Sequence, residues 1–243
     1  REDYDAYLSR VNRAVFSPYT QRLIRAATGL ILRKPITVLG DPYWTDVFVK
    51  DVDGCGSDLD EYARRSLICA LTYGHSNTLV DFPAPKGARN LAEERQQNRR
   101  PYWIEIDPSK ICGWRLDREV NYGKLIQVRI SEQAVVADGE FGEKVYDQIR
   151  VIEPGKYRIY RKKESTKDMY TQSNTYAGSF DSPANEQDYE IVESGDFSLG
   201  EIPLVTVYSG KTDTMTSKPP LLDIAHLNLA HFQRQADLIH SLH

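Results

Sequence analysis

The spacing of hydrophobic and polar positions changes twice along the chain, from helical to alternating and back to helical. Up to about residue 100 the apolar residues recur at helical spacing. A first helix would start near Ser17 as its cap, with Pro18 in the first turn, and end before Pro35. A second would follow a turn and cap at 54–57 and stop at Gly74. Residues 1–100 are therefore predicted to be mainly helical, with a short strand over 75–82 and an exposed charged helix over 88–100.

The spacing becomes alternating between residues 101 and 210, which is typical of strands. Strands are expected over 102–106, 125–130, 145–152 and 157–161, joined in one antiparallel meander. Pro154 and Gly155 suit a type II turn, because proline presets φ and glycine accepts a positive φ at the next position. The polar stretch 164–188 has too few apolar residues to fold alone and is interpreted as a flexible loop.

A strand over 202–208 and then a helix over 219–243 are predicted at the end of the chain, with Pro219 and Pro220 in the first helical turn. One apolar row of this helix contains Leu222, Ala225, Leu229, Phe232, Ala236 and Ile239. A second row contains Leu221, Ile224, Leu227, Leu238 and Leu242. One neighbour cannot cover both rows, so we expect one to pack on the same subunit and the other on a second subunit. No stop signal follows, so the helix is expected to continue beyond a truncated end. The predicted class is α+β.

Charge is segregated along the chain, although the net charge is only −4. Residues 7–40 contain no acid, and residues 181–210 contain seven acids and no base. Such blocks can steer nucleic acid, solubilise a surface or join identical subunits head to tail. We expect the last, with a neighbour's acidic surface contacting four basic side chains, Arg10, Arg13, Arg22 and Arg25.

Candidate chemistry is sparse. The glycine-rich segment 54–57 lacks the lysine of a phosphate-binding loop, and the histidines of the last helix lack the i, i+4 pair of a metal site. Glu105 and Asp107 lie near Lys110 but not in the order of a two-metal nuclease. We expect no catalytic residue, no metal and no cofactor, and three reduced cysteines. The basic and aromatic strip 156–163 is interpreted as the exposed face of an edge strand, with nucleic-acid binding as the alternative.

Several stretches, taken in their order, resemble the tailed-bacteriophage portal proteins, in a portal-like branch known as a domain of unknown function. They are SPYTQRLIRAATGLILRKP (17–35), DLDEYARRSLICALTYGHSNTLVDFP (58–83), RPYWIEIDPSKICGWR (100–115), IPLVTVYSG (202–210) and KPPLLDIAHLNLAHFQRQADLIHSLH (218–243). The resemblance covers nearly the whole chain. It implies the wing of a portal subunit followed by the start of its first stem helix, without the clip, second stem helix, tunnel loop or crown.

What the resemblance implies about function is structural. Portal proteins form rings of typically twelve identical subunits at one capsid vertex of the virion, after assembly in the host cytoplasm. Double-stranded DNA passes through the ring without sequence-specific contacts during packaging and ejection. The expected partners are other copies of the chain, the major capsid protein, terminase and the head–tail adaptor or neck protein, and no membrane. The protein is expected not to be an enzyme. The alternatives are a phage nuclease and a basic module that binds nucleic acid or membranes.

Overall fold

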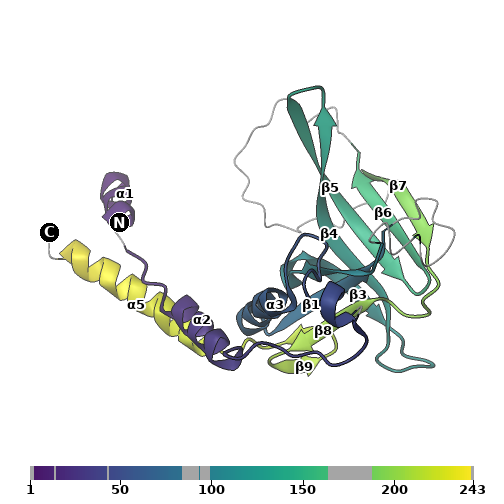
Figure 1. The fold of residues 1–243 in the computed structure, drawn as a ribbon. Helices are drawn as coiled ribbons and strands as arrows, with labels where there is room; N and C mark the ends of the chain where they lie inside the picture. The colour runs from purple at the N-terminus through teal and green to yellow at the C-terminus, as the bar shows by residue number, and fades with distance from the viewer. Residues whose placement is uncertain are drawn as a thin grey trace. The chain divides into compact units, whose positions relative to one another are not determined.

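The computed structural model describes residues 3–13, 15–42, 44–83, 93, 99–163 and 188–241 (Figure 1). It has the predicted α+β class, with helices and antiparallel sheets. The chain forms two compact units: unit 1 contains residues 1–108 and 204–243, and unit 2 contains residues 109–203. Unit 2 is therefore inserted between two segments of unit 1. The predicted loop 164–188, except residue 188, and most of the predicted helix 88–100 lie outside the described residues.

The helices of unit 1 are α1 (Tyr4–Arg13), α2 (Tyr19–Ile31), a π-helical turn η1 (Trp44–Phe48), α3 (Leu59–Tyr73) and α5 (Leu222–Ser241). Its strands are β1 (His75–Asp81), β2 (Tyr102–Ile106), β8 (Leu204–Tyr208), β9 (Lys211–Asp213) and β10 (Thr216–Ser217). A 3-10 turn, η2 (Pro108–Lys110), leads into unit 2. The strands of unit 2 are β3 (Ile111–Leu116), β4 (Leu125–Asp138), β5 (Gly142–Glu153), β6 (Lys156–Lys162) and β7 (Tyr189–Asp196).

Unit 1 is built around β1, which lies between β2 and β8 in an antiparallel sheet. The hydroxyl of Tyr62 in α3 donates to Thr78 of β1 over 2.9 Å, which fixes the helix on the sheet. Beside this bond, the rings of Phe48 and Tyr62 each pack edge to face on the ring of Trp103. Val52, which is fully buried, belongs to the same cluster. The core of unit 1 thus joins η1, α3 and β2.

Unit 2 is a five-stranded antiparallel meander in the order β3-β4-β5-β6-β7. Its buried apolar side chains are Val128, Ile130, Val151, Ile152, Ile159 and Ile202. Gly155 lies between β5 and β6 with φ +80°, as the predicted turn requires. The predicted strands 125–130 and 145–152 are longer than expected, and β3 and β7 were not predicted.

The strand 102–106 was predicted as part of this meander, which is wrong. It is β2 and pairs with β1 in unit 1. Pro108 provides a physical reason for the change of sheet, because proline has no amide hydrogen to continue a strand ladder. It opens η2, after which β3 enters the other sheet.

The predicted helix ends are correct in part. Gly74 ends α3 with φ +92°, and its amide donates to the carbonyl of Ala70. However, the side chain that caps α3 is Asp58, not Ser57: its carboxylate accepts from the amide of Glu61. Ser17 does not cap α2, which has Pro18 at its N-cap and no side-chain cap. Pro219 and Pro220 precede α5, which starts at Leu222, instead of forming its first turn.

The start of α5 is anchored where α3 meets β1. The Ser209 hydroxyl donates to the carbonyl of Ala70 over 2.6 Å, and the Ser209 amide donates to the carbonyl of Gly74. Ser217, close to the start of α5, lies 2.6 Å from Nδ1 of the buried His75. A side chain at Gly74 would meet the Ser217 hydroxyl at 2.5 Å and the Lys218 backbone at 3.0 Å. Glycine is therefore required at this junction for both its φ and its size.

We expect Gly74→Ala to lower the free energy of unfolding by about 2 to 5 kcal/mol, because positive φ and crowding against residues 217–218 act together. Gly56→Ala is the matched control: Gly56 has φ +94° but open space around it, so about 1 to 2 kcal/mol should be lost there. Urea unfolding followed by circular dichroism measures both. Equal losses would mean that residues 217–218 can move away from Gly74 at no cost.

Candidate interaction surfaces

One side of α5 is covered by the N-terminal helices. Phe16 packs edge to face on Phe232, with ring centroids 5.5 Å apart, and Tyr19 packs on His231 at 5.7 Å. On this covered side Asn228 and Ala236 are buried. In the first predicted row, Ala236 is buried and Leu222, Ala225 and Phe232 are partly buried. Its partners are α1 and α2 rather than a sheet.

The burial expected for that row is not seen at its two other members, Leu229 and Ile239. Leu229 is half exposed, because it lies at the edge of the covered side. The side chain of Ile239 lies outside the described residues. The burial of the polar Asn228 was not predicted either, because hydrophobic spacing cannot indicate a buried amide.

Most described members of the second predicted row are exposed within the single chain. Leu227 is 69% exposed and Leu238 is 60% exposed. His231 lies between them on the same side of the helix, at spacings of four and seven residues. Leu242 lies outside the described residues. Among the described members of this row, Ile224, Leu227 and Leu238 are therefore exposed, whereas Leu221 is partly buried. The assignment of each row to one subunit or to its neighbour stays a prediction.

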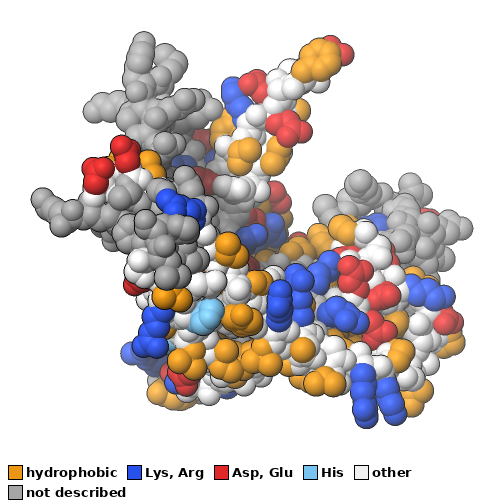
Figure 2. Space-filling view, turned by 90° about the vertical axis from the view of Figure 1, so that its left-hand side faces the viewer, with side chains coloured by type: hydrophobic (Ala, Val, Ile, Leu, Met, Phe, Trp, Pro, Cys, Tyr) orange, Lys and Arg blue, Asp and Glu red, His pale blue; other side chains and the backbone are white. Residues whose placement is uncertain are grey.

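A similar row follows α2. Ile24 and Thr28 are buried, whereas Tyr19, Leu23 and Leu30 form an exposed row at spacings of four and seven, with Leu30 74% exposed. The contact between Tyr19 and His231 joins this row to that of α5. We call the joined surface the helical face; it contains Tyr19, Leu23 and Leu30 of α2 and Ile224, Leu227 and Leu238 of α5. In Figure 2, hydrophobic side chains gather over the helical part, which is turned to the viewer.

Basic side chains flank this face. Arg22 and Arg25 are exposed on α2 and make no ion pair within the described part of the chain. Arg13 is also exposed, at the end of α1. The side chain of Arg10 lies outside the described residues. The helical face is thus apolar with a basic margin on its α2 side, while on α5 both Asp223 and Arg234 are exposed. The predicted contacts of these arginines with a neighbour stay a prediction.

The basic strip 156–163 contains the whole of β6, which lies between β5 and β7, so the edge-strand interpretation is wrong. Three of its five cations contact side chains of β5. Lys156 and Arg158 both contact the carboxylate of Glu153, at 3.2 and 3.0 Å, and Arg161 stacks over Tyr146. The acidic block also contributes a neighbouring strand, β7. Opposite charges therefore meet inside this sheet.

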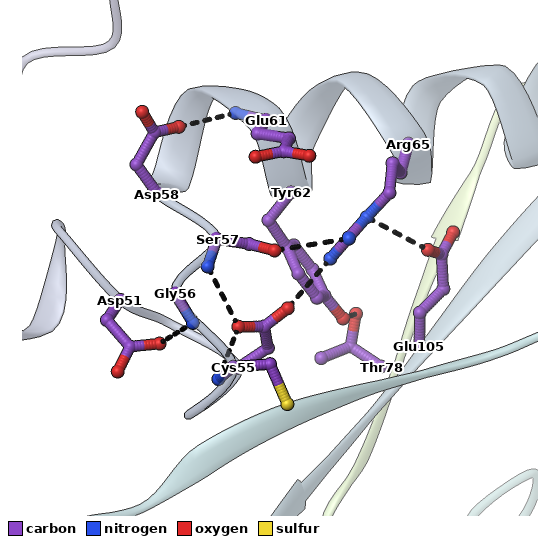
Figure 3. Close-up of polar contacts among 11 residues, drawn as sticks. Asp51, Cys55, Gly56, Ser57, Asp58, Glu61, Tyr62, Arg65, Thr78 and Glu105 are labelled. Atoms are coloured by element: carbon purple, nitrogen blue, oxygen red, sulfur yellow. Dashed lines mark hydrogen bonds and ion pairs between the residues drawn. The ribbon is translucent and has the colours of Figure 1, made fainter.

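The glycine-rich loop before α3 is filled by the protein's own carboxylates (Figure 3). Asp53 accepts hydrogen bonds from the amides of Cys55 and Ser57, at 2.9 and 3.1 Å, and Asp51 accepts from Gly56 at 2.9 Å. Arg65 of α3 completes the group with an ion pair to Asp53 at 3.0 Å. The amides that could cradle a phosphate are already satisfied, so the turn interpretation is correct.

Asp53 and Asp51 each pair with an arginine, the partly exposed Arg65 and the buried Arg100. Burial alone would raise the pKa of Asp53, but hydrogen bonds from Ser57, Cys55 and Arg65 outweigh it, so its pKa lies well below the usual value. The second oxygen of Asp51 lies 2.6 Å from Arg100, whose side chain is almost fully buried over the ring of Phe48. Sequence spacing did not indicate these pairs, because their members are up to 49 residues apart.

The acids considered for a nuclease site do not form a metal-binding cluster. Burial raises the pKa of Glu105, and its nearest cation is Arg65, with Nε 3.7 Å from the carboxylate. Within the described ranges no group of three or more His, Cys, Asp or Glu side chains could hold a metal ion. None of the described helices is both long enough and apolar enough to span a membrane. The three cysteines are free thiols.

Comparison of the sequence with models of protein families and with curated proteins finds no match. The surfaces described above therefore supply the structural basis for a functional assignment.

We expect Asp53→Asn to lower the free energy of unfolding by about 1 to 3 kcal/mol at pH 7, since Arg65 would lose its buried partner. The folded-state pKa of Asp53 is depressed, so its contribution is present above the unfolded pKa of about 4 and is lost as the pH falls below it. The difference between the two proteins should shrink accordingly. The exposed Asp46→Asn serves as control. A difference independent of pH would contradict the role of the charge.

Proposed function

We propose that this protein is a structural subunit of a phage portal ring and supplies the wing and the first stem helix. The order of the stretches that resemble portal proteins supports this proposal. The observation that carries it is the helical face, because apolar side chains aligned along two adjacent helices are typical of a contact with another chain. Every copy in a closed ring has two neighbours, so such a face can be covered throughout the assembly.

The free energies of side-chain burial and of association favour an extended contact over a local one. Complete burial of one leucine side chain contributes about 1.5 to 3 kcal/mol. Association costs roughly 4 to 15 kcal/mol in lost translational and rotational freedom. Leu227 and Leu238 alone are therefore too few, whereas the whole helical face together with its basic margin can supply a stable interface. This agrees with a helix that packs along its length.

In this function the protein acts in the virion, at one vertex of the capsid, after assembly in the host cytoplasm. A ring of twelve copies would surround the channel through which double-stranded DNA is packaged and ejected. Terminase, the head–tail adaptor and the major capsid protein would dock on that ring. The role is mechanical and structural, and the energy for packaging comes from the terminase. No membrane is needed.

We expect the purified protein to form particles much heavier than one chain, and Leu227→Asp with Leu238→Asp to reduce them strongly. Both side chains are exposed, so the double variant should keep the circular dichroism spectrum and lose little stability. Gln233→Asp, an exposed polar position of α5, is the matched control and should assemble normally. Mass photometry measures the particles. A monomeric wild type at every concentration, or unimpaired assembly of the double variant, would contradict the proposal.

The proposed structural role also predicts that the protein does not cleave DNA in the presence of Mg²⁺. Glu105 faces Arg65, and the described acids form no metal-ligand cluster. The measurement is an incubation of the purified protein with double-stranded and single-stranded DNA. Cleavage that disappears in Glu105→Gln or Asp107→Asn would instead favour a phage nuclease.

A further inference from the structure

A second uncovered apolar surface lies on the β4–β5 hairpin of unit 2. The pairing of β3 with β4 ends at Ile130, and that of β6 with β5 starts at Gln148. Residues 133–138 of β4 and 142–147 of β5 therefore pair with each other and with no other described strand. We call residues 133–147 the arm; it extends past β6 in Figure 1. An isolated two-stranded hairpin is marginally stable in water.

The arm has exposed apolar side chains among its charged residues. Val135 and Val145 are directly paired across the two strands on one face, and they are 60% and 58% exposed. Phe141 at the tip is 95% exposed. A large aromatic ring at a hairpin tip, followed by a pair of exposed valines, is typical of a segment that inserts into a partner.

The charge of the arm narrows the choice of partner. Glu140 and Glu143 are exposed next to Phe141, while Asp138 is paired with Lys144 over 3.1 Å. The unpaired charges near the tip are therefore negative. Phosphate groups of DNA and anionic lipid headgroups would repel this tip, whereas an apolar surface with a positive margin would attract it.

The helical face has these properties. Leu23, Leu30 and Leu227 supply exposed apolar side chains, and Arg22 and Arg25 supply exposed charges without an acidic partner among the described residues. Both the arm and the helical face are exposed in the same single chain. A second copy of the chain therefore offers the arm an exposed apolar surface with basic side chains beside it.

We propose that the arm of one copy docks on the helical face of a second copy. This contact rests on the proposed ring function and specifies it: it is head to tail, with different surfaces on the two sides. A heterologous contact of this kind leaves one free arm and one free helical face at the ends of any open chain of subunits. Ring closure uses both, so every copy in the ring has its arm and helical face covered.

The contact is tested with two charge-reversed variants and their combination. Arg22→Glu with Arg25→Glu alters the helical face, and Glu140→Lys with Glu143→Lys alters the arm. Each should weaken assembly at least about tenfold in mass photometry, and all four changes in one chain should restore it in large part, because opposite charges again meet. Glu119→Lys, an exposed acid in a turn of unit 2, is the control and should assemble normally.

A photo-crosslinker at position 141 locates the contact directly. Phe141→benzoylphenylalanine should give crosslinked dimers whose second peptide comes from α2 or α5. The same substitution at Tyr122, also 90% exposed in unit 2, is the control and should give few. Crosslinking to a surface other than α2 or α5, or arm variants that assemble like wild type, would overturn the inference.

These results separate the inference from the proposed function. If the Leu227→Asp and Leu238→Asp protein fails to assemble while the arm variants form normal particles, the ring stands and the helical face binds another surface. If the wild type stays monomeric, both proposals fail. Arm variants that assemble normally but no longer bind a second phage protein would assign the arm to that partner instead of to a second copy.

Discussion

The pairing of β8 with β1 is the interaction on which unit 1 depends. It joins His75 to Tyr208 and Leu79 to Leu204, so two segments more than 120 residues apart become neighbours in one sheet. Without it β1 would lose one of its two partners, and the segment that leads to α5 would keep only the contacts of Ser209, Gly210 and Ser217. Bringing such distant segments together costs chain entropy, which the burial of β1 on both faces offsets. The whole of unit 2 is inserted inside this loop.

The position of α5 follows from that pairing. The end of β8 leads to Ser209 and Gly210, whose amides both donate to the carbonyl of Gly74. The short hairpin of β9 and β10 then returns the chain to the same junction, where Ser217 contacts His75. The helix therefore starts at a defined point of unit 1 and packs on α1 and α2. Its outer side, with Leu227 and Leu238, is left uncovered by this arrangement and not by any local property of the helix.

The two charged blocks have different environments, which limits what each can do. The acidic strand β7 lies beside the basic strand β6, and Glu153 of β5 pairs with two cations of that strand, so opposite charges of these blocks are neighbours inside unit 2. The carboxylates of Asp51 and Asp53 are likewise used within unit 1, by loop amides and by Arg65 and Arg100. In contrast, Arg22 and Arg25 on α2 and Glu140 and Glu143 on the arm remain exposed. These exposed charges are available for electrostatic contacts with other molecules.

Local patterns in the sequence determined the class of the fold, the end of α3 at Gly74, the turn at Gly155 and the two rows of α5. Each of these depends on residues within one or two turns of each other or on the φ of a single glycine. The tertiary structure alone decided that β2 belongs with β1, that β6 is an inner strand, that Asp53 is held by Arg65 and that Asn228 is buried. These features depend on which distant segments of the chain pack against each other. Apolar spacing shows that one side of a helix or strand must be buried, but it does not identify the segment that buries it. For the same reason the sequence indicated that α5 has an outer row, whereas only the structure showed that α2 continues that row into one face.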